Sequence, residues 1–141
     1  MKTVDAAVTI LSEIKNHEKW FLFINTKETH YPYDTGEGYS NEVIPLLEKM
    51  QRHLNLRHDN EEFTKEELEI LHKMQISALE KTDERLKKLV DELPRNKPIL
   101  AIICADHGES FGEKFYGFQR CGHLHPSTEV IQVPLLISLI K

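Results

Sequence analysis

The sequence has 141 residues and a formal net charge of −5, from 18 basic and 23 acidic side chains. A chain of this length corresponds to one domain, so we expect residues 1–141 to form a single domain with one hydrophobic core. The acidic balance gives no electrostatic basis for nucleic-acid binding, which depends on a cationic surface that meets phosphates.

The N-terminal residues predict an amphipathic helix. Apolar side chains recur at helical spacing from Val4 to Ile14, and Asp5 and Glu13 interrupt them. These charges are atypical of a signal peptide or a membrane span, so we expect no membrane segment. The expected location is cytoplasmic, unless the chain is part of a longer exported protein. The two cysteines are then expected to be reduced thiols.

The first predicted strand covers residues 20–25, with the sequence Trp-Phe-Leu-Phe-Ile-Asn. It ends in polar residues that lead to His30, Tyr31 and Pro32. Pro32 favours an extended backbone at Tyr31, which suits a loop that holds His30 rigidly. This segment therefore places a histidine just beyond a strand.

Two polar helices are predicted in the middle of the chain. Apolar residues recur at helical spacing over 43–54, and Pro45 is best tolerated in a first turn, so this helix should begin near residues 40–44. A capping-box sequence at 64–67 opens a second helix that extends to Leu93. That helix would span about 45 Å, and a break midway is left open. Three histidines of this region lack a metal-binding pattern and are interpreted as surface residues: His53, His58 and His72.

The next segment joins a predicted strand to a polar turn. Apolar, mostly β-branched residues at 99–103 are typical of a strand buried on both faces in an α/β sheet. Ligands of such sheets bind beyond the carboxyl ends of the strands, where this chain places Asp106 and His107. A carboxylate and a neutral imidazole are good ligands for zinc or manganese. The alternative is that the pair only caps a following helix.

A third segment again places histidine beside a predicted strand. The sequence Cys-Gly-His-Leu-His-Pro occupies residues 121–126 and precedes a strand predicted over 130–137. The alternate spacing of Cys121, His123 and His125 is a weak signal that Cys121 binds metal. Glu109 has two interpretations, as the acceptor of a ligand histidine's proton or as a partner in a loop salt bridge.

These three segments, in this order, resemble the alkaline phosphatase superfamily, closest to its sulfatase and phosphoethanolamine-transferase branches. Such proteins carry a Glu-Thr-His-x-Pro-Tyr loop after a strand, which residues 28–33 match. They carry Ala-Asp-His-Gly-Glu-Ser-x-Gly-Glu, matched by residues 105–113, and then a Gly-His element, matched by residues 122–123. A closing Glu-Val-x-x-Val-Pro-Leu-Ile strand is matched by residues 129–136, so the resemblance spans about residues 20–137.

The resemblance implies a metal-dependent hydrolase or transferase that acts on an anionic sulfate or phosphate ester. It implies that Asp106, His107 and His123 bind a divalent metal ion, which could be zinc, manganese or calcium. His30 and His125 are further candidate ligands. The resemblance also implies that His30 and His123 are catalytic, by contacting the substrate anion or protonating the leaving group.

The family's nucleophile segment has no match in this sequence. Family members supply a Thr, Ser or formylglycine precursor from the N-terminal half, together with further acidic metal ligands. Here Cys104 lies within a predicted strand, and Cys121 precedes Gly-His instead of x-Pro-Ser-Arg. Two readings stay open: a hydrolase or transferase domain whose nucleophile half is supplied elsewhere, and a non-catalytic remnant or interaction module that keeps the family sheet.

The expected fold class is α/β, with a partial mixed sheet of about three or more strands flanked by helices. It corresponds to the C-terminal half of a sulfatase-like domain. Three strands are few for a sheet with a buried central member, and exposed strand edges favour pairing with another chain. We therefore expect a homo-oligomer or a separate partner that supplies the N-terminal half.

Overall fold

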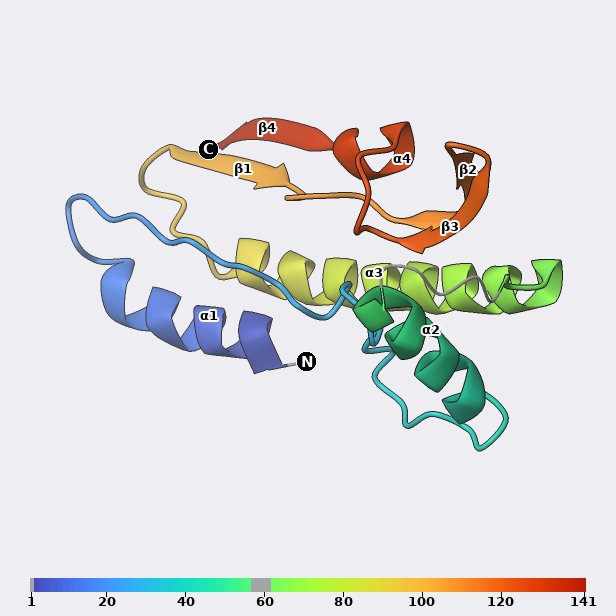
Figure 1. Ribbon diagram of the computed structural model, residues 1–141. Coiled ribbons are helices and arrows are strands. Elements are labelled where there is room, and N and C mark those ends of the chain that lie inside the picture. The colour runs from blue at the N-terminus through green and yellow to red at the C-terminus, as the bar shows by residue number, and fades with distance from the viewer. Residues whose placement is uncertain (1, 57–61) are drawn as a thin grey trace. The chain divides into compact units, whose positions relative to one another are not determined.

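The computed structural model describes residues 2–56 and 62–141. His58, interpreted from the sequence as a surface residue, lies outside the described residues. The predicted α/β class is confirmed (Figure 1). The elements in chain order are α1 (Lys2–Ile14), α2 (Ile44–Leu56), α3 (Lys65–Asp91), β1 (Ile99–Cys104), β2 (Ser110–Phe115), β3 (Phe118–Gly122), α4 (Thr128–Ile131) and β4 (Leu135–Ile140).

The chain divides into two compact units. Unit 1 comprises Met1–Gly38, Lys73–Pro98 and Lys141, and unit 2 comprises Tyr39–His72 and Ile99–Ile140. Helix α3 therefore contributes its first turns to unit 2 and the remainder to unit 1. Whether both units belong to one domain over residues 1–141 stays a prediction.

Unit 1 has its core between α1 and the later turns of α3. Val4, Ala7 and Leu11 recur three and four residues apart, so they share one face of α1, and they are buried together with Leu89 of α3. The amphipathic helix predicted for the N-terminal residues is confirmed. Further partly buried side chains pack on this core: Val8, Trp20, Leu22, Ile24, Leu86 and Leu93.

Residues 20–25 do not form the predicted strand. Burial alternates along them, because the even-numbered side chains pack on the core of unit 1 while Phe21 and Phe23 are 86% and 76% exposed. A period of two is that of a β-strand. A strand also needs a hydrogen-bonded neighbour, however, and the described part of the chain supplies no ladder here.

The capping box predicted at 64–67 is confirmed at the start of α3. The Thr64 N–H donates to Glu67 Oε2 at 2.8 Å, and the Glu67 N–H donates to Thr64 Oγ1 at 3.2 Å. Each side chain thus satisfies a backbone donor that the helix itself leaves unpaired. From this start α3 continues to Asp91 without a break.

Unit 2 contains two antiparallel two-stranded sheets. β1 pairs with β4, from Ile99 opposite Ile140 to Cys104 opposite Leu135. β2 pairs with β3 in a hairpin that the sequence did not predict. The arrangement is therefore antiparallel rather than mixed. The closing strand begins at residue 135 instead of 130, because residues 128–131 form the short helix α4.

The β1–β4 sheet has an exposed apolar face. The side chains on this face alternate along each strand and lie opposite one another in the register. Five of them are more than half exposed: Leu100, Ile102, Leu135, Ile137 and Leu139. The predicted burial of residues 99–103 on both faces is therefore wrong for this chain, because a sheet of only two strands has too few apolar neighbours to cover it.

Candidate active site

The Asp-His-Gly motif lies directly beyond the carboxyl end of β1. Because β1 ends at Cys104, Asp106 and His107 have left the strand and do not alternate across it. The His107 N–H donates to Asp106 Oδ1 at 3.1 Å, and this oxygen lies 3.9 Å from His107 Nε2. The two side chains are therefore close enough to serve one ion, as the predicted ligand pair requires.

One ring nitrogen of His107 contacts the backbone. His107 Nδ1 lies 2.9 Å from the carbonyl oxygen of Gly108. A carbonyl oxygen only accepts hydrogen bonds, so Nδ1 carries the proton. In the neutral ring Nε2 is then the acceptor nitrogen, which is the form that a metal ligand needs.

His123, from the turn after β3, stacks on His107. Their ring centroids are 4.1 Å apart with an interplanar angle of 26°, and each offers a ring nitrogen within 4.8 Å of the other's. His123 Nδ1 lies 2.5 Å from Glu109 Oε1. The partner of Glu109 is thus a histidine, and the contact is a hydrogen bond if the ring is neutral and a salt bridge if it is protonated.

Glycine is required at position 108 by the close approach of α4. The Gly108 N–H donates to the carbonyl oxygen of Val130 at 2.8 Å. A Cβ at Gly108 would lie only 2.1 Å from the carbonyl oxygen of Glu129. This contact holds the Asp-His-Gly turn against α4, the helix that follows His123 and His125 in the chain.

His125 bonds to Ser110, away from the stacked histidine pair. Its Nε2 lies 2.9 Å from Ser110 Oγ, which is also 3.3 Å from Ser127 Oγ. Burial, and then the nearby Arg120 cation, lower the pKa of His125 and favour its neutral form. Metal binding by His125 stays a prediction, and binding through Nε2 would require the bond to Ser110 to break.

Cys121 has the properties of a core residue. It is buried, with its Sγ 3.2 Å from Met50 Sδ. Burial, and then the carboxylates of Glu109 and Glu113, raise the pKa of the Cys121 thiol to about 12. Because only the thiolate binds metal well, this environment agrees with the low expectation for Cys121 as a ligand.

His30 belongs to unit 1, in a loop that is tied down by its neighbours. His30 Nδ1 lies 2.5 Å from the carbonyl oxygen of Tyr31, and the Tyr31–Pro32 peptide bond is cis. The side chain of Glu28 is buried and accepts from the Thr3 N–H at 3.1 Å, which joins the loop to α1. The role of His30 at the site stays a prediction.

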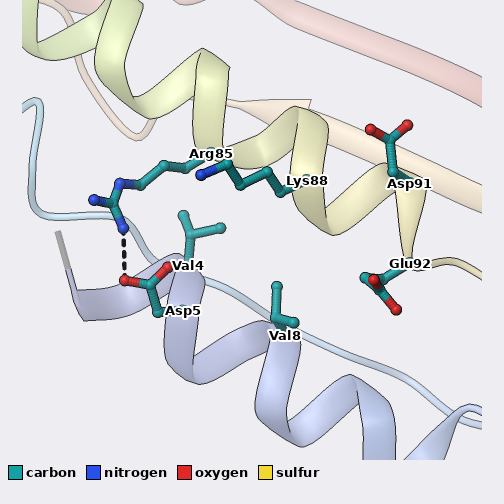
Figure 2. A pocket seen from close by; sticks show the side chains of 7 residues that line it. All are labelled: Val4, Asp5, Val8, Arg85, Lys88, Asp91 and Glu92. Carbon is teal, nitrogen blue, oxygen red and sulfur yellow. Dashed lines mark hydrogen bonds and ion pairs between the residues drawn. The ribbon is translucent and has the colours of Figure 1, made fainter.

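A separate hollow lies in unit 1 between α1 and α3 (Figure 2). Its volume is about 520 Å³, and Arg85 Nη1 bonds to Asp5 Oδ2 there at 2.6 Å. It contains no residue of the three motifs. The lining residues are Val4, Asp5, Val8, Arg85, Lys88, Asp91 and Glu92.

The chain matches the sulfatase family model over residues 1–140. It therefore belongs to the sulfatase family, as its motifs predicted, and this supports a sulfatase-like hydrolase function at the level of the family. Members of this family generally use a divalent metal ion. No curated protein and no solved structure matches the chain significantly. None of the helices in the described ranges is long and apolar enough to cross a membrane.

The donors in unit 2 fit a divalent ion. Asp106 offers a carboxylate that is 84% exposed, so an ion could reach it from solvent. His107 and His123 each have Nδ1 beside an oxygen acceptor, on Gly108 and Glu109 respectively. Histidines that bind metal through one nitrogen usually donate the other N–H to such an oxygen, which fixes the ring.

Proposed function

We propose that this chain contributes the metal-binding part of an active site that cleaves or transfers an anionic sulfate or phosphate ester. The observation that carries the proposal is that His107, beyond the end of β1, lies beside Asp106 and stacks on His123. Membership of the sulfatase family supports the reaction class. Sulfate and phosphate esters are both anionic, so the same donors serve either substrate.

Asp106, His107 and His123 would hold the ion, which when bound would polarise the ester oxygens and offset their negative charge. Two imidazoles and one carboxylate favour zinc or manganese over calcium, because calcium prefers ligands that are all oxygen. The ring stacking of the two histidines and their oxygen partners keep these side chains ordered before an ion arrives.

The proposed role of His30 is to contact the substrate anion or to protonate the leaving group, and the same role is open to His123. A histidine can hold or release a proton near neutral pH, as general acid–base catalysis requires. The support for His30 comes from its place in the family loop at 28–33 and from the packing of that loop on α1.

The nucleophile and the remaining acidic ligands are proposed to come from a different polypeptide segment. The sequence contains no match to the family's nucleophile turn. The apolar face of the β1–β4 sheet also provides a surface for such a segment to cover. Covering this face would stabilise the pairing, because burial of apolar area contributes roughly 25 cal/mol per Å². A homo-oligomer is the other arrangement that would cover this face.

A non-catalytic interaction module is the alternative function. The same exposed sheet face favours it, because that face would bind a partner whether or not a reaction takes place. Recovery of turnover on adding a nucleophile-bearing half separates the two functions, since a non-catalytic module can keep a bound ion without catalysing a reaction.

Calorimetry of the 141-residue chain with zinc tests the proposal. We expect weak binding, because this chain supplies three protein ligands and a closed zinc site usually has four. Asp106→Ala and His107→Ala should each weaken binding further. His17→Ala, which removes an exposed histidine of unit 1, is the control and should bind zinc as the parent chain does. Zinc binding that is absent, or that survives both ligand substitutions, contradicts the proposal.

A further inference from the structure

We infer that Glu109 is a positioning residue, which holds His123 in the tautomer with the proton on Nδ1 and so leaves Nε2 as the acceptor. The inference deepens the proposed function, because the use of Nε2 as a metal ligand rests on that function. The geometry that fixes the tautomer belongs to unit 2 alone.

The contact between Glu109 and His123 is short and shielded from water. His123 Nδ1 lies 2.5 Å from Glu109 Oε1, and the side chains of Glu109 and His123 are only 4% and 17% exposed. An ionised carboxylate can only accept hydrogen bonds, so the histidine must donate.

The backbone around Glu109 is anchored on both sides. The Gly108 N–H donates to the Val130 carbonyl oxygen, and Ser110 is fully buried at the start of β2, with its hydroxyl beside His125 Nε2 and the Ser127 hydroxyl. The backbone of Glu109 is therefore held by the anchored residues on either side of it.

The ring of His123 is constrained in two directions. Glu109 fixes one edge of the ring through Nδ1, and the stacked ring of His107 fixes its plane at a centroid distance of 4.1 Å. Because the edge and the plane of the His123 ring are both fixed, the direction in which Nε2 points is fixed as well. Which nitrogen of a histidine binds a metal is decided by the hydrogen bond that the other nitrogen makes. Loss of such a bond typically lowers metal affinity by about 10–100-fold.

The first measurement uses the metal-free 141-residue chain with ¹⁵N-labelled histidine. In wild type, the neutral form of His123 should show a single tautomer with the proton on Nδ1. Glu109→Ala should convert it to the other tautomer or to a mixture. Glu109→Gln keeps an oxygen acceptor and should restore the wild-type tautomer. Glu113→Ala is the matched control, because this exposed carboxylate of β2 accepts from the Phe111 N–H and should leave His123 unchanged.

Zinc affinity of the same proteins is the second measurement. Glu109→Ala should bind zinc about 10–100-fold more weakly than wild type, and Glu109→Gln should recover part of that loss. An unchanged His123 tautomer in a folded Glu109→Ala protein with wild-type amide dispersion overturns the inference. If wild type binds no zinc, the proposed function fails, and the tautomer still decides whether Glu109 positions His123.

Discussion

Ser110 Oγ lies 2.9 Å from His125 Nε2, and this bond joins the first residue of β2 to the segment that follows β3. Ser110 is completely buried, and its hydroxyl is also 3.3 Å from that of Ser127. The serine of the family motif is therefore a structural link beside the proposed site. Its burial argues against direct contact with a substrate.

Ser110→Ala should lower the free energy of unfolding by about 1–3 kcal/mol, because it leaves polar groups of His125 and Ser127 without this partner. Urea denaturation followed by circular dichroism measures the change. Ser12→Ala is the control: its hydroxyl is exposed on α1, so the expected change is within about 0.5 kcal/mol. Equal midpoints for Ser110→Ala and wild type would show that the bond contributes no stability.

Acid should destabilise the start of α3 through Glu67. The pKa of Glu67 is lowered by its hydrogen bond to Lys49, 2.8 Å away, and by the Thr64 N–H. A carboxyl whose pKa is lower in the folded state stabilises the fold above its unfolded pKa of 4.5, and this stabilisation is lost as the pH falls through the folded value.

Glu67→Gln should therefore flatten the pH dependence of stability below pH 4.5. Glutamine can still accept from the Thr64 N–H, so the capping bond itself is preserved. Denaturation midpoints measured across this acid range provide the test. Glu66→Gln, at the exposed neighbouring position, should keep the wild-type slope. A wild-type slope in Glu67→Gln would contradict the assignment.

The two cysteines should react very differently with a thiol reagent. Cys104 is exposed, whereas Cys121 is buried and its pKa is raised to about 12. Near pH 8 only about one Cys121 thiol in ten thousand is then ionised, and the thiolate is the reactive form. Timed alkylation should show one fast thiol in wild type and none in Cys104→Ser. Fast labelling of Cys104→Ser under native conditions would contradict the buried position of Cys121.

Local sequence signals predicted the helices and the start of the motif well. The amphipathic period located α1, and the capping box located the first residue of α3. The apolar run at 99–103 matches β1 to within one residue. Each of these signals depends on residues that are close together in the chain, which is why the sequence alone could show them.

Features that depend on distant partners were not predictable in the same way. The alternation at 20–25 is strand-like, but a ladder needs a second strand that no local pattern supplies. The pairing of Glu109 with His123 spans 14 residues and follows from the β2–β3 hairpin, which was not predicted. The burial of Ser110 depends on the same hairpin. A positive-φ pair at Tyr116 and Gly117 is the local sign of its turn.

A charge on the exposed sheet face should affect assembly more than folding. Ile102 is 57% exposed and Ile137, opposite it in the register, is 60% exposed. Ile102→Lys should therefore change the stability of the isolated chain by less than about 1 kcal/mol. It should reduce binding of an apolar dye and any self-association seen by analytical ultracentrifugation. A large loss of stability would mean that the face is already covered in the chain by itself.

The isolated chain should hydrolyse p-nitrophenyl sulfate and p-nitrophenyl phosphate poorly or not at all, even with zinc or manganese present. The covalent route needs an activated Ser, Thr or formylglycine, and the buried Ser110 and Ser127 are unsuited to that role. A trace rate can still arise from positioned acids and bases.

Adding an N-terminal half from a sulfatase-family protein should restore turnover if the proposed split site is correct, and Ile102→Lys should block that recovery. Fast turnover by the chain alone that Ser110→Ala or Ser127→Ala abolishes would show that the nucleophile lies in this sequence after all.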